Sequence, residues 1–193
     1  MTQKIKIPCV ILAGGKSSRL GVDKTQIDFG GESLSKWVFT RLSYICENVY
    51  ISAKKSDKWT FQAPFLIEKS RVFAPLIGMI NAFEMLKAQE ILFVSVDTPF
   101  VSKQTLWHIA HSNAPIAYAQ STKAHYLIAK WHICLLDALL AARKSKLYAL
   151  HYIVESHPHI SIPATEEECL NINTQEHYAE ALKLLALGAS NGR

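Results

Sequence analysis

Residues 10–24 read V-I-L-A-G-G-K-S-S-R-L-G-V-D-K, an apolar run that gives way to a small-residue, basic loop. The apolar residues begin at Ile5 and show no alternation, which predicts a buried strand over Ile5–Leu12. Glycines after such a strand let the backbone approach a ligand and expose N–H groups to an anion. Arg19 and Lys24 add positive charge to the loop. The stretch therefore predicts a phosphate site at the carboxyl end of the first strand.

Two common nucleotide fingerprints are absent from this loop. A P-loop requires glycine five residues before the glycine of Gly15-Lys16-Ser17, and that position is Val10. The dinucleotide pattern G-x-G-x-x-G also fails, because the two glycines are adjacent and position 18 is serine. Taken alone, the stretch is also compatible with an ordinary turn followed by a solvated basic segment.

Composition limits the class of protein. The chain has 193 residues, 49% hydrophobic and 19% charged, which predicts one domain at 1–188 and a short tail at 189–193. The net charge of +5 is spread along the chain, which suits a small anionic substrate and argues against nucleic acid. The four cysteines form no C-x-x-C pair. With neither a signal peptide nor a membrane span evident, we expect a cytoplasmic protein without a membrane partner.

Hydrophobic periodicity predicts alternating strands and helices. We expect strands at 5–12, 48–53, 65–67, 91–96, 115–120 and 126–131, with an extended segment at 157–163. Helices are predicted from Ser33, at 76–87, at 132–143, at 147–154 and after Asn173, which would cap the last helix with Glu176 at its third position. This order is typical of an α/β parallel sheet, in which ligands lie at the carboxyl ends of strands. Gly14 and Asp97 both follow such ends.

Four segments together resemble a known family. They are L-A-G-G…R-L-G-x-D-K at 12–24, A-P-L-I-G-M at 74–79, V-D-T-P-F at 96–100 and N-I-N-T-Q-E at 171–176. In this order they resemble the molybdenum cofactor guanylyltransferases. The resemblance implies a three-layer, Rossmann-like nucleotidyltransferase fold, with a mostly parallel central sheet and helices on both faces. It also implies transfer of GMP from GTP to the phosphate of a molybdopterin-type cofactor, with release of pyrophosphate.

The resemblance also implies roles for individual residues. The catalytic residues are Arg19, Lys24 and Asp97. Asp97 is expected to hold Mg²⁺, which proteins bind through one or two carboxylates plus substrate phosphates. The nucleotide is expected to contact Leu12, Ala13, Gly14, Gly15, Lys24 and Asp97. The molybdopterin is expected to contact Arg19, Gly78, Asn171 and Asn173. His125 aligns with a family histidine, although a lone histidine is more often structural, and Asn173 fits helix capping at least as well as a substrate contact.

Several positions depart from the family pattern. Lys54 and Lys69 stand where relatives carry residues that contact the base, which leaves the choice of guanine open. A cytidylyltransferase or a sugar-phosphate nucleotidyltransferase on the same scaffold is the nearest alternative. A non-catalytic adaptor that binds nucleotide or cofactor is a second alternative, and Arg19, Lys24 and Asp97 together argue against it. Partners beyond the two substrates would be molybdoenzymes or chaperones that accept the product.

Overall fold

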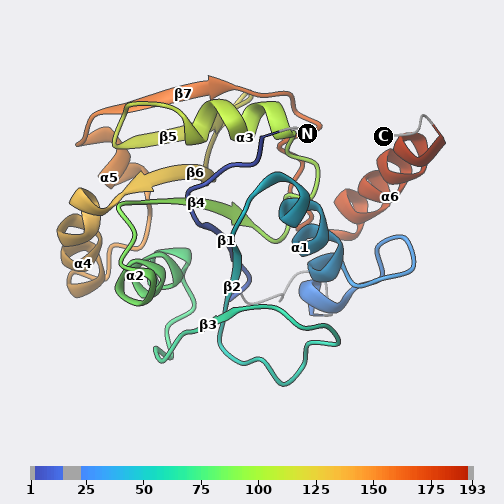
Figure 1. The fold of residues 1–193 in the computed structure, drawn as a ribbon, viewed down its shortest axis with the longest axis horizontal. Coiled ribbons are helices and arrows are strands. Elements are labelled where there is room, and N and C mark those ends of the chain that lie inside the picture. The colour runs from blue at the N-terminus through green and yellow to red at the C-terminus, as the bar shows by residue number, and fades with distance from the viewer. Residues whose placement is uncertain (1–2, 15–22, 191–193) are drawn as a thin grey trace.

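The computed structural model describes residues 3–14 and 23–190. Its strands are β1 Cys9–Leu12, β2 Val49–Ala53, β3 Phe65–Ile67, β4 Glu90–Ser95, β5 Ile116–Gln120, β6 Ala124–His132 and β7 His159–Pro163. The α-helices are α1 Leu34–Ile45, α2 Pro75–Leu86, α3 Lys103–Ala110, α4 Leu136–Lys144, α5 His151–Glu155 and α6 Gln175–Ser190. Two 3₁₀ turns, η1 Lys24–Gln26 and η2 Ile133–Leu135, complete the order (Figure 1).

All seven strands join one sheet in the order β3-β2-β1-β4-β6-β5-β7. Strands β3, β2, β1 and β4 run parallel, and β6 alone pairs antiparallel with its two neighbours. β1 and β4 lie side by side, with Leu12 opposite Ser95. This arrangement confirms the predicted α/β architecture and places the strand before Gly14 beside the strand before Asp97.

Alternating side chains of the central strands pack on opposite faces of the sheet. On β4, Leu92 and Val94 face the core that contains residues of α1, α3 and α6, whereas Ile91 and Phe93 face the core with α2, α4 and α5. Figure 1 shows α1 and α6 on the opposite side of the sheet from α2 and α4. The central strands are apolar on both faces because helices cover both faces.

Several predicted boundaries are wrong. The first strand is shorter than predicted because Pro8, which has no backbone N–H, precedes it, and Ile5 forms only an isolated bridge with Cys46. Helix α3 was not predicted, since its eight residues bury only Thr105, Leu106, Ile109 and Ala110. The helix predicted from His132 begins at Leu136, because His132 belongs to β6, and the one predicted from Leu147 begins at His151.

The start of α6 also differs from the prediction. The Thr174 hydroxyl, and not Asn173, accepts a hydrogen bond from the backbone N–H of His177, at 3.3 Å. Glu176 is consequently the second helical residue. The side chain of Asn173 therefore does not cap α6 and can form other hydrogen bonds. Across the described ranges, the structure contains no helix that combines the length and apolarity needed to span a membrane.

Truncation of Phe93 should measure how much the central strand contributes to stability. Phe93 is fully buried on β4 and packs edge-on against Phe83, with ring centroids 5.8 Å apart. Phe93→Ala should lower the free energy of unfolding by about 3–5 kcal/mol, as other large core truncations do. Tyr44→Ala, on a side chain that is 76% exposed, should change it by no more than about 0.5 kcal/mol in the same urea titration.

Candidate functional site

The first residues of the predicted phosphate loop and Asp97 lie at the same end of the sheet, after the carboxyl ends of two neighbouring strands. Ala13 and Gly14 follow β1, and Val96 and Asp97 follow the neighbouring strand β4. The backbone N–H of Val96 donates to the carbonyl of Leu12 at 3.2 Å, and that of Ala13 donates to the carbonyl of Ser52 at 2.9 Å. The two segments thus leave the sheet together, which confirms the expectation that Gly14 and Asp97 share an end of the sheet.

A cavity of about 190 Å³ opens where these segments diverge. We call it the front pocket. Its walls include seven of the predicted site residues, namely Leu12, Ala13, Gly14, Lys24, Asp97, Asn171 and Asn173. Gly15 and Arg19, which the sequence also predicts for this site, lie outside the described residues.

The polar centre of the front pocket is an ion pair. Nζ of Lys24 lies 3.2 Å from Oδ2 of Asp97, and both side chains are largely buried. Lys24 also donates to Oδ1 of Asn173, whose amide donates in turn to Oδ1 of Asn171 at 2.6 Å. The second oxygen of Asp97 accepts a hydrogen bond from the Ser95 hydroxyl. A cation, a carboxylate and two amides are therefore linked in one network at the strand ends.

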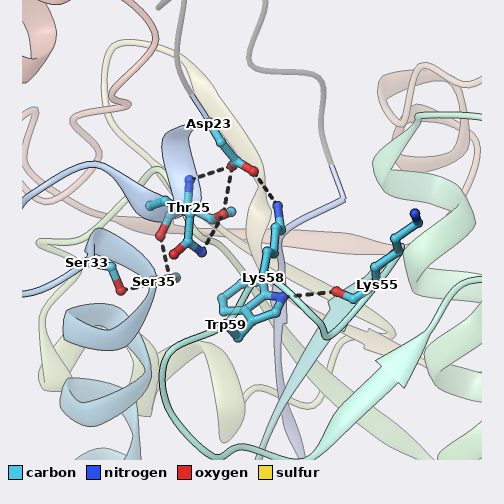
Figure 2. Close-up of polar contacts among 8 residues, drawn as sticks. Asp23, Thr25, Ser33, Ser35, Lys55, Lys58 and Trp59 are labelled. Carbon is cyan, nitrogen blue, oxygen red and sulfur yellow. Dashed lines mark hydrogen bonds and ion pairs between the residues drawn. The ribbon is translucent and has the colours of Figure 1, made fainter.

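Local hydrogen bonds fix the segment that carries Lys24. Asp23 accepts from the backbone N–H of Thr25 at 3.0 Å and from its hydroxyl at 2.7 Å, which caps the turn η1. Nζ of Lys58 lies 2.5 Å from Oδ2 of Asp23 and ties the loop after β2 to the same turn (Figure 2). Hydrogen bonds to Lys58 and Thr25 lower the pKa of Asp23, against burial, which is the largest single influence and raises it.

Glu68 is a pocket residue that the sequence did not reveal. Its carboxylate is buried, accepts from Ser52 Oγ at 2.9 Å and pairs with Nζ of Lys54 at 2.6 Å. It also lies so close to the glycine loop that a Cβ on Gly14 would sit 2.7 Å from Oε1. Comparison with the family pattern drew attention to Lys69, whereas the carboxylate that faces the pocket belongs to the preceding residue. The available signal was an acidic residue directly after the apolar run of β3.

Lys54 also forms hydrogen bonds with the loop that forms one wall of the pocket. Besides Glu68, Nζ of Lys54 donates to the carbonyls of Ser70 and Val72 at 2.9 and 2.7 Å. Its charge also lies 5.3 Å from the ring of Phe73. Lys54 therefore neutralises Glu68 and holds the 70–73 segment at the same time.

Gly78 lies behind the front pocket and does not line it. It is buried on α2, where an added Cβ would meet Leu12 Cδ2 and Ser52 Oγ at 2.9 Å each. It thus allows α2 to pack closely against the strands that carry the pocket. A direct contact with molybdopterin at Gly78 stays a prediction.

A second and larger hollow of about 720 Å³ adjoins the front pocket. We call it the side hollow. Asn171 and Asn173 line both spaces, so the polar network at Lys24 stands at their junction. The other walls come from the β5–β6 turn, the 166–170 segment and α6, and they include Lys123, His125, Glu166, Glu167, His177 and Glu180. Nδ1 of His177 is buried and has no hydrogen-bond partner in the part of the chain that the structure describes.

Comparison with known proteins identifies the family. The model of the MobA-like NTP transferase domain matches residues 9–160. This chain belongs to that family. It is 40% identical over 197 residues to a molybdenum cofactor guanylyltransferase of Helicobacter pylori, a match that covers 97% of this chain and 93% of the relative. A probable molybdenum cofactor guanylyltransferase of Aquifex aeolicus is 27% identical over 181 residues, or 91% of this chain and 90% of the relative.

Solved structures of other proteins share the fold. Molybdopterin-guanine dinucleotide biosynthesis protein A from Archaeoglobus fulgidus superposes with a TM-score of 0.81 at 17% identity, over 93% of this chain and 99% of that one. The 2-C-methyl-D-erythritol 4-phosphate cytidylyltransferase of Thermus thermophilus gives a TM-score of 0.73 at 16% identity, over 94% and 99%. Proteins named for different nucleotides therefore share this fold.

Alanine at Gly14 should block the front pocket without unfolding the protein. The new Cβ would press on Glu68 Oε1 at 2.7 Å, so either the carboxylate or the loop must move. We expect Gly14→Ala to weaken GTP binding in isothermal titration about tenfold or more, the loss of about 1.4 kcal/mol that one displaced polar contact can cause. Gly188→Ala is the matched control, because its Cβ would meet nothing within 4 Å. Equal GTP affinity in both variants would contradict the placement of nucleotide against Gly14.

Proposed function

We propose that this MobA-like NTP transferase transfers GMP from GTP to the phosphate of a molybdopterin-type cofactor. A phosphate oxygen of the acceptor attacks the α-phosphorus of GTP, a new P–O–P linkage forms, and pyrophosphate leaves. The observation that carries the proposal is the Lys24–Asp97–Asn173 network, which stands where the two spaces meet. Such a reaction needs the two substrates aligned and their charges offset, and no nucleophile from the protein.

Lys24 and Asp97 are suited to the two charges of a nucleoside triphosphate bound with Mg²⁺. Asp97 is the pocket carboxylate that follows β4 and contacts Lys24, whereas Glu68, which follows β3, is paired with Lys54. Among the described residues no group of three acidic, histidine or cysteine side chains is placed to hold a metal. A single carboxylate fits Mg²⁺, which takes its remaining ligands from phosphates and water. Bound there, the ion would offset charge on the phosphates. Lys24 would exchange its contact with Asp97 for the phosphates and stabilise the departing pyrophosphate.

Glu68 supports guanine as the base. A carboxylate accepts hydrogen bonds and donates none, and guanine presents two adjacent donors, N1–H and the N2 amino group. Ser52 and Lys54 occupy two of the roughly four acceptor positions of Glu68, whose side chain lines the front pocket, and we assign the remaining acceptor capacity to the base. Cytosine presents its N4 amino group beside N3, an acceptor that the carboxylate would repel. The Lys54–Glu68 pair therefore favours GTP, although the family pattern left the base open.

The side hollow supports a heterocyclic acceptor in preference to a second triphosphate. Burial, with a smaller effect of Lys123, lowers the pKa of His125, so its imidazole is neutral near pH 7. Hydrogen bonds from Thr122 hold the pKa of Glu166 below its usual value, so that carboxylate stays ionised. A space lined by Glu166, Glu167 and Glu180 repels phosphates, but it accepts the N–H groups of a pterin ring. The acceptor phosphate would then point toward Lys24, past Asn171 and Asn173.

The remaining roles follow from this proposal. Arg19 would bind the triphosphate or the phosphate of the pterin, and Leu12, Ala13 and Gly14 would contact the nucleotide through their backbone. The dinucleotide product would pass to molybdoenzymes or to chaperones that load them, in the cytoplasm. A cytidylyltransferase, a sugar-phosphate nucleotidyltransferase and a non-catalytic adaptor remain the alternatives that the following experiments separate.

Nucleotide-dependent thermal shift tests the base. With Mg²⁺ present, GTP should stabilise the protein more than CTP, ATP or UTP, and at about a hundredfold excess over Kd it should add roughly 2.7 kcal/mol. Glu68→Gln replaces one acceptor oxygen by an amide that donates, so it should reduce the preference for GTP over CTP. Equal or greater stabilisation of the wild-type protein by CTP would move the assignment to a cytidylyltransferase.

Substitution of Asp97 and Lys24 tests the chemistry. Asp97→Asn keeps the size and removes the charge, and it should lower the rate of pyrophosphate release by about 100-fold or more. The melting temperature should fall as well, because the largely buried Lys24 loses its carboxylate partner, so the assay runs below the melting temperature of the variant. Lys24→Ala should weaken GTP binding as well as turnover, because its charge acts on the ground state and the transition state alike. The assay contains GTP, Mg²⁺ and molybdopterin-loaded acceptor protein.

Asp137→Asn is the matched control for the charge, since this exposed residue lies on α4, away from both spaces. Its turnover should equal that of the wild-type protein. Near-normal turnover in Asp97→Asn would make Asp97 a turn residue. A wild-type protein that binds GTP yet releases no pyrophosphate with a competent acceptor would favour the adaptor.

A further inference from the structure

The two charged residues of the network lie on short segments that depend on other elements for their position. Lys24 belongs to the three-residue turn η1, and Asp97 lies just after the last residue of β4. The segments on which these two residues stand both contact helix α1, whose twelve residues pack on the central strands. Helix α1 is therefore placed to fix one segment relative to the other.

The N-terminal turn of α1 holds the segment that carries Lys24. Ser35 Oγ donates to the carbonyl of Thr25 at 2.6 Å, and both residues are buried, at 1% and 3% exposure. The backbone N–H of Leu34 donates to the carbonyl of Ile27 at 2.9 Å, just beyond η1. Figure 2 shows Ser35, in the first turn of α1, next to Thr25. The residue next to Lys24 is thus bonded to the helix through a buried contact.

The middle of α1 holds the segment that follows Asp97. The guanidinium of Arg41 donates through Nη1 to the carbonyls of Pro99, at 3.0 Å, and Val101, and through Nη2 to that of Phe100, at 3.4 Å. Burial lowers the pKa of Arg41, and the charge of Glu168 offsets part of this effect. A planar fork of donors can hold three consecutive carbonyls, which a single ammonium group cannot do with the same geometry.

Aromatic packing joins the same three pieces of the chain. Phe29 follows η1, Trp37 lies on α1 and Phe100 follows Asp97. Their ring centroids are 5.2 Å apart for Phe29–Trp37, 5.9 Å for Phe29–Phe100 and 6.1 Å for Trp37–Phe100. Each ring therefore contacts both others, and the Arg41 guanidinium lies 5.6 Å from the centroid of the Trp37 ring.

We infer that α1 fixes the separation of Lys24 and Asp97, with Ser35 and Arg41 as positioning residues for nucleotidyl transfer. This inference rests on the proposed function. A cation for the phosphates and a carboxylate for the metal act together only at a fixed spacing, and a displacement of about 1 Å can cost roughly 100-fold in rate. Neither Ser35 nor Arg41 lines the front pocket or the side hollow, so each acts through the segment that it holds.

Substitutions of Arg41 and of Ser35 should have different kinetic effects. Arg41→Met frees the segment after Asp97, so the Mg²⁺ concentration for half-maximal rate should rise and kcat should fall about 10- to 100-fold. Arg41→Lys keeps the charge and some of the bonds, so it should restore part of both losses. Ser35→Ala frees the segment of Lys24, so KM for GTP should rise about fivefold while the half-maximal Mg²⁺ concentration stays unchanged.

Arg143→Met, on an exposed arginine of α4, is the matched control and should leave all three parameters unchanged. Assays run well below the melting temperature of each variant, with circular dichroism to verify folding. If Arg41→Met does not fold, Arg41→Lys and Ser35→Ala still test the same difference. The first should change the half-maximal Mg²⁺ concentration, and the second should change KM for GTP. Folded variants that lose only thermal stability, with the kinetic parameters of the wild-type protein, would overturn the inference. A wild-type protein that releases no pyrophosphate from GTP would instead overturn the proposed function.

Discussion

The contact between Lys24 and Asp97 joins two segments that lie 73 residues apart in the chain, with Nζ and Oδ2 3.2 Å apart. Two largely buried charges are tolerated because each has other polar partners: Asn173 for Lys24 and Ser95 for Asp97. The parallel pairing of β1 with β4 makes the contact available, since it brings the carboxyl ends of both strands to one edge. The pocket, the junction of the two spaces and the role of α1 all depend on this arrangement.

A second buried pair, Lys54 with Glu68, gives the pocket its other side. Here the lysine neutralises the carboxylate and bonds the 70–73 segment, while the missing side chain of Gly14 leaves room for Glu68. The absence of a side chain at Gly14 therefore leaves room for the Glu68 carboxylate as well as for a phosphate. The family pattern emphasised positions 54 and 69 as departures, yet positions 54 and 68 form the polar wall.

Most contacts around the site are made by elements far apart in the chain. Asn171 and Asn173 reach the Lys24 network because the backbone N–H of Ile172 donates to the carbonyl of Asp97 at 2.9 Å. Thr174 caps α6 and so releases Asn173 for this network. Arg41 and Ser35 contact the same region from α1. The hydrophobic periodicity of this helix predicts only that it is amphipathic. A polar residue on such a helix gives no local sign of its partner.

The alternation of strands and helices, the parallel core and the position of Asp97 at the same end of the sheet as the glycine loop could all be predicted from the sequence. These follow from local physical signals: apolar runs, glycine after a strand and Ser33 as a helix cap. Tertiary structure alone decided that Glu68 faces the pocket, that Asn173 bonds Lys24 in place of capping α6, and that α1 links the two charged segments. Each of these depends on which distant side chain fills the space opposite, and no local pattern encodes that neighbour.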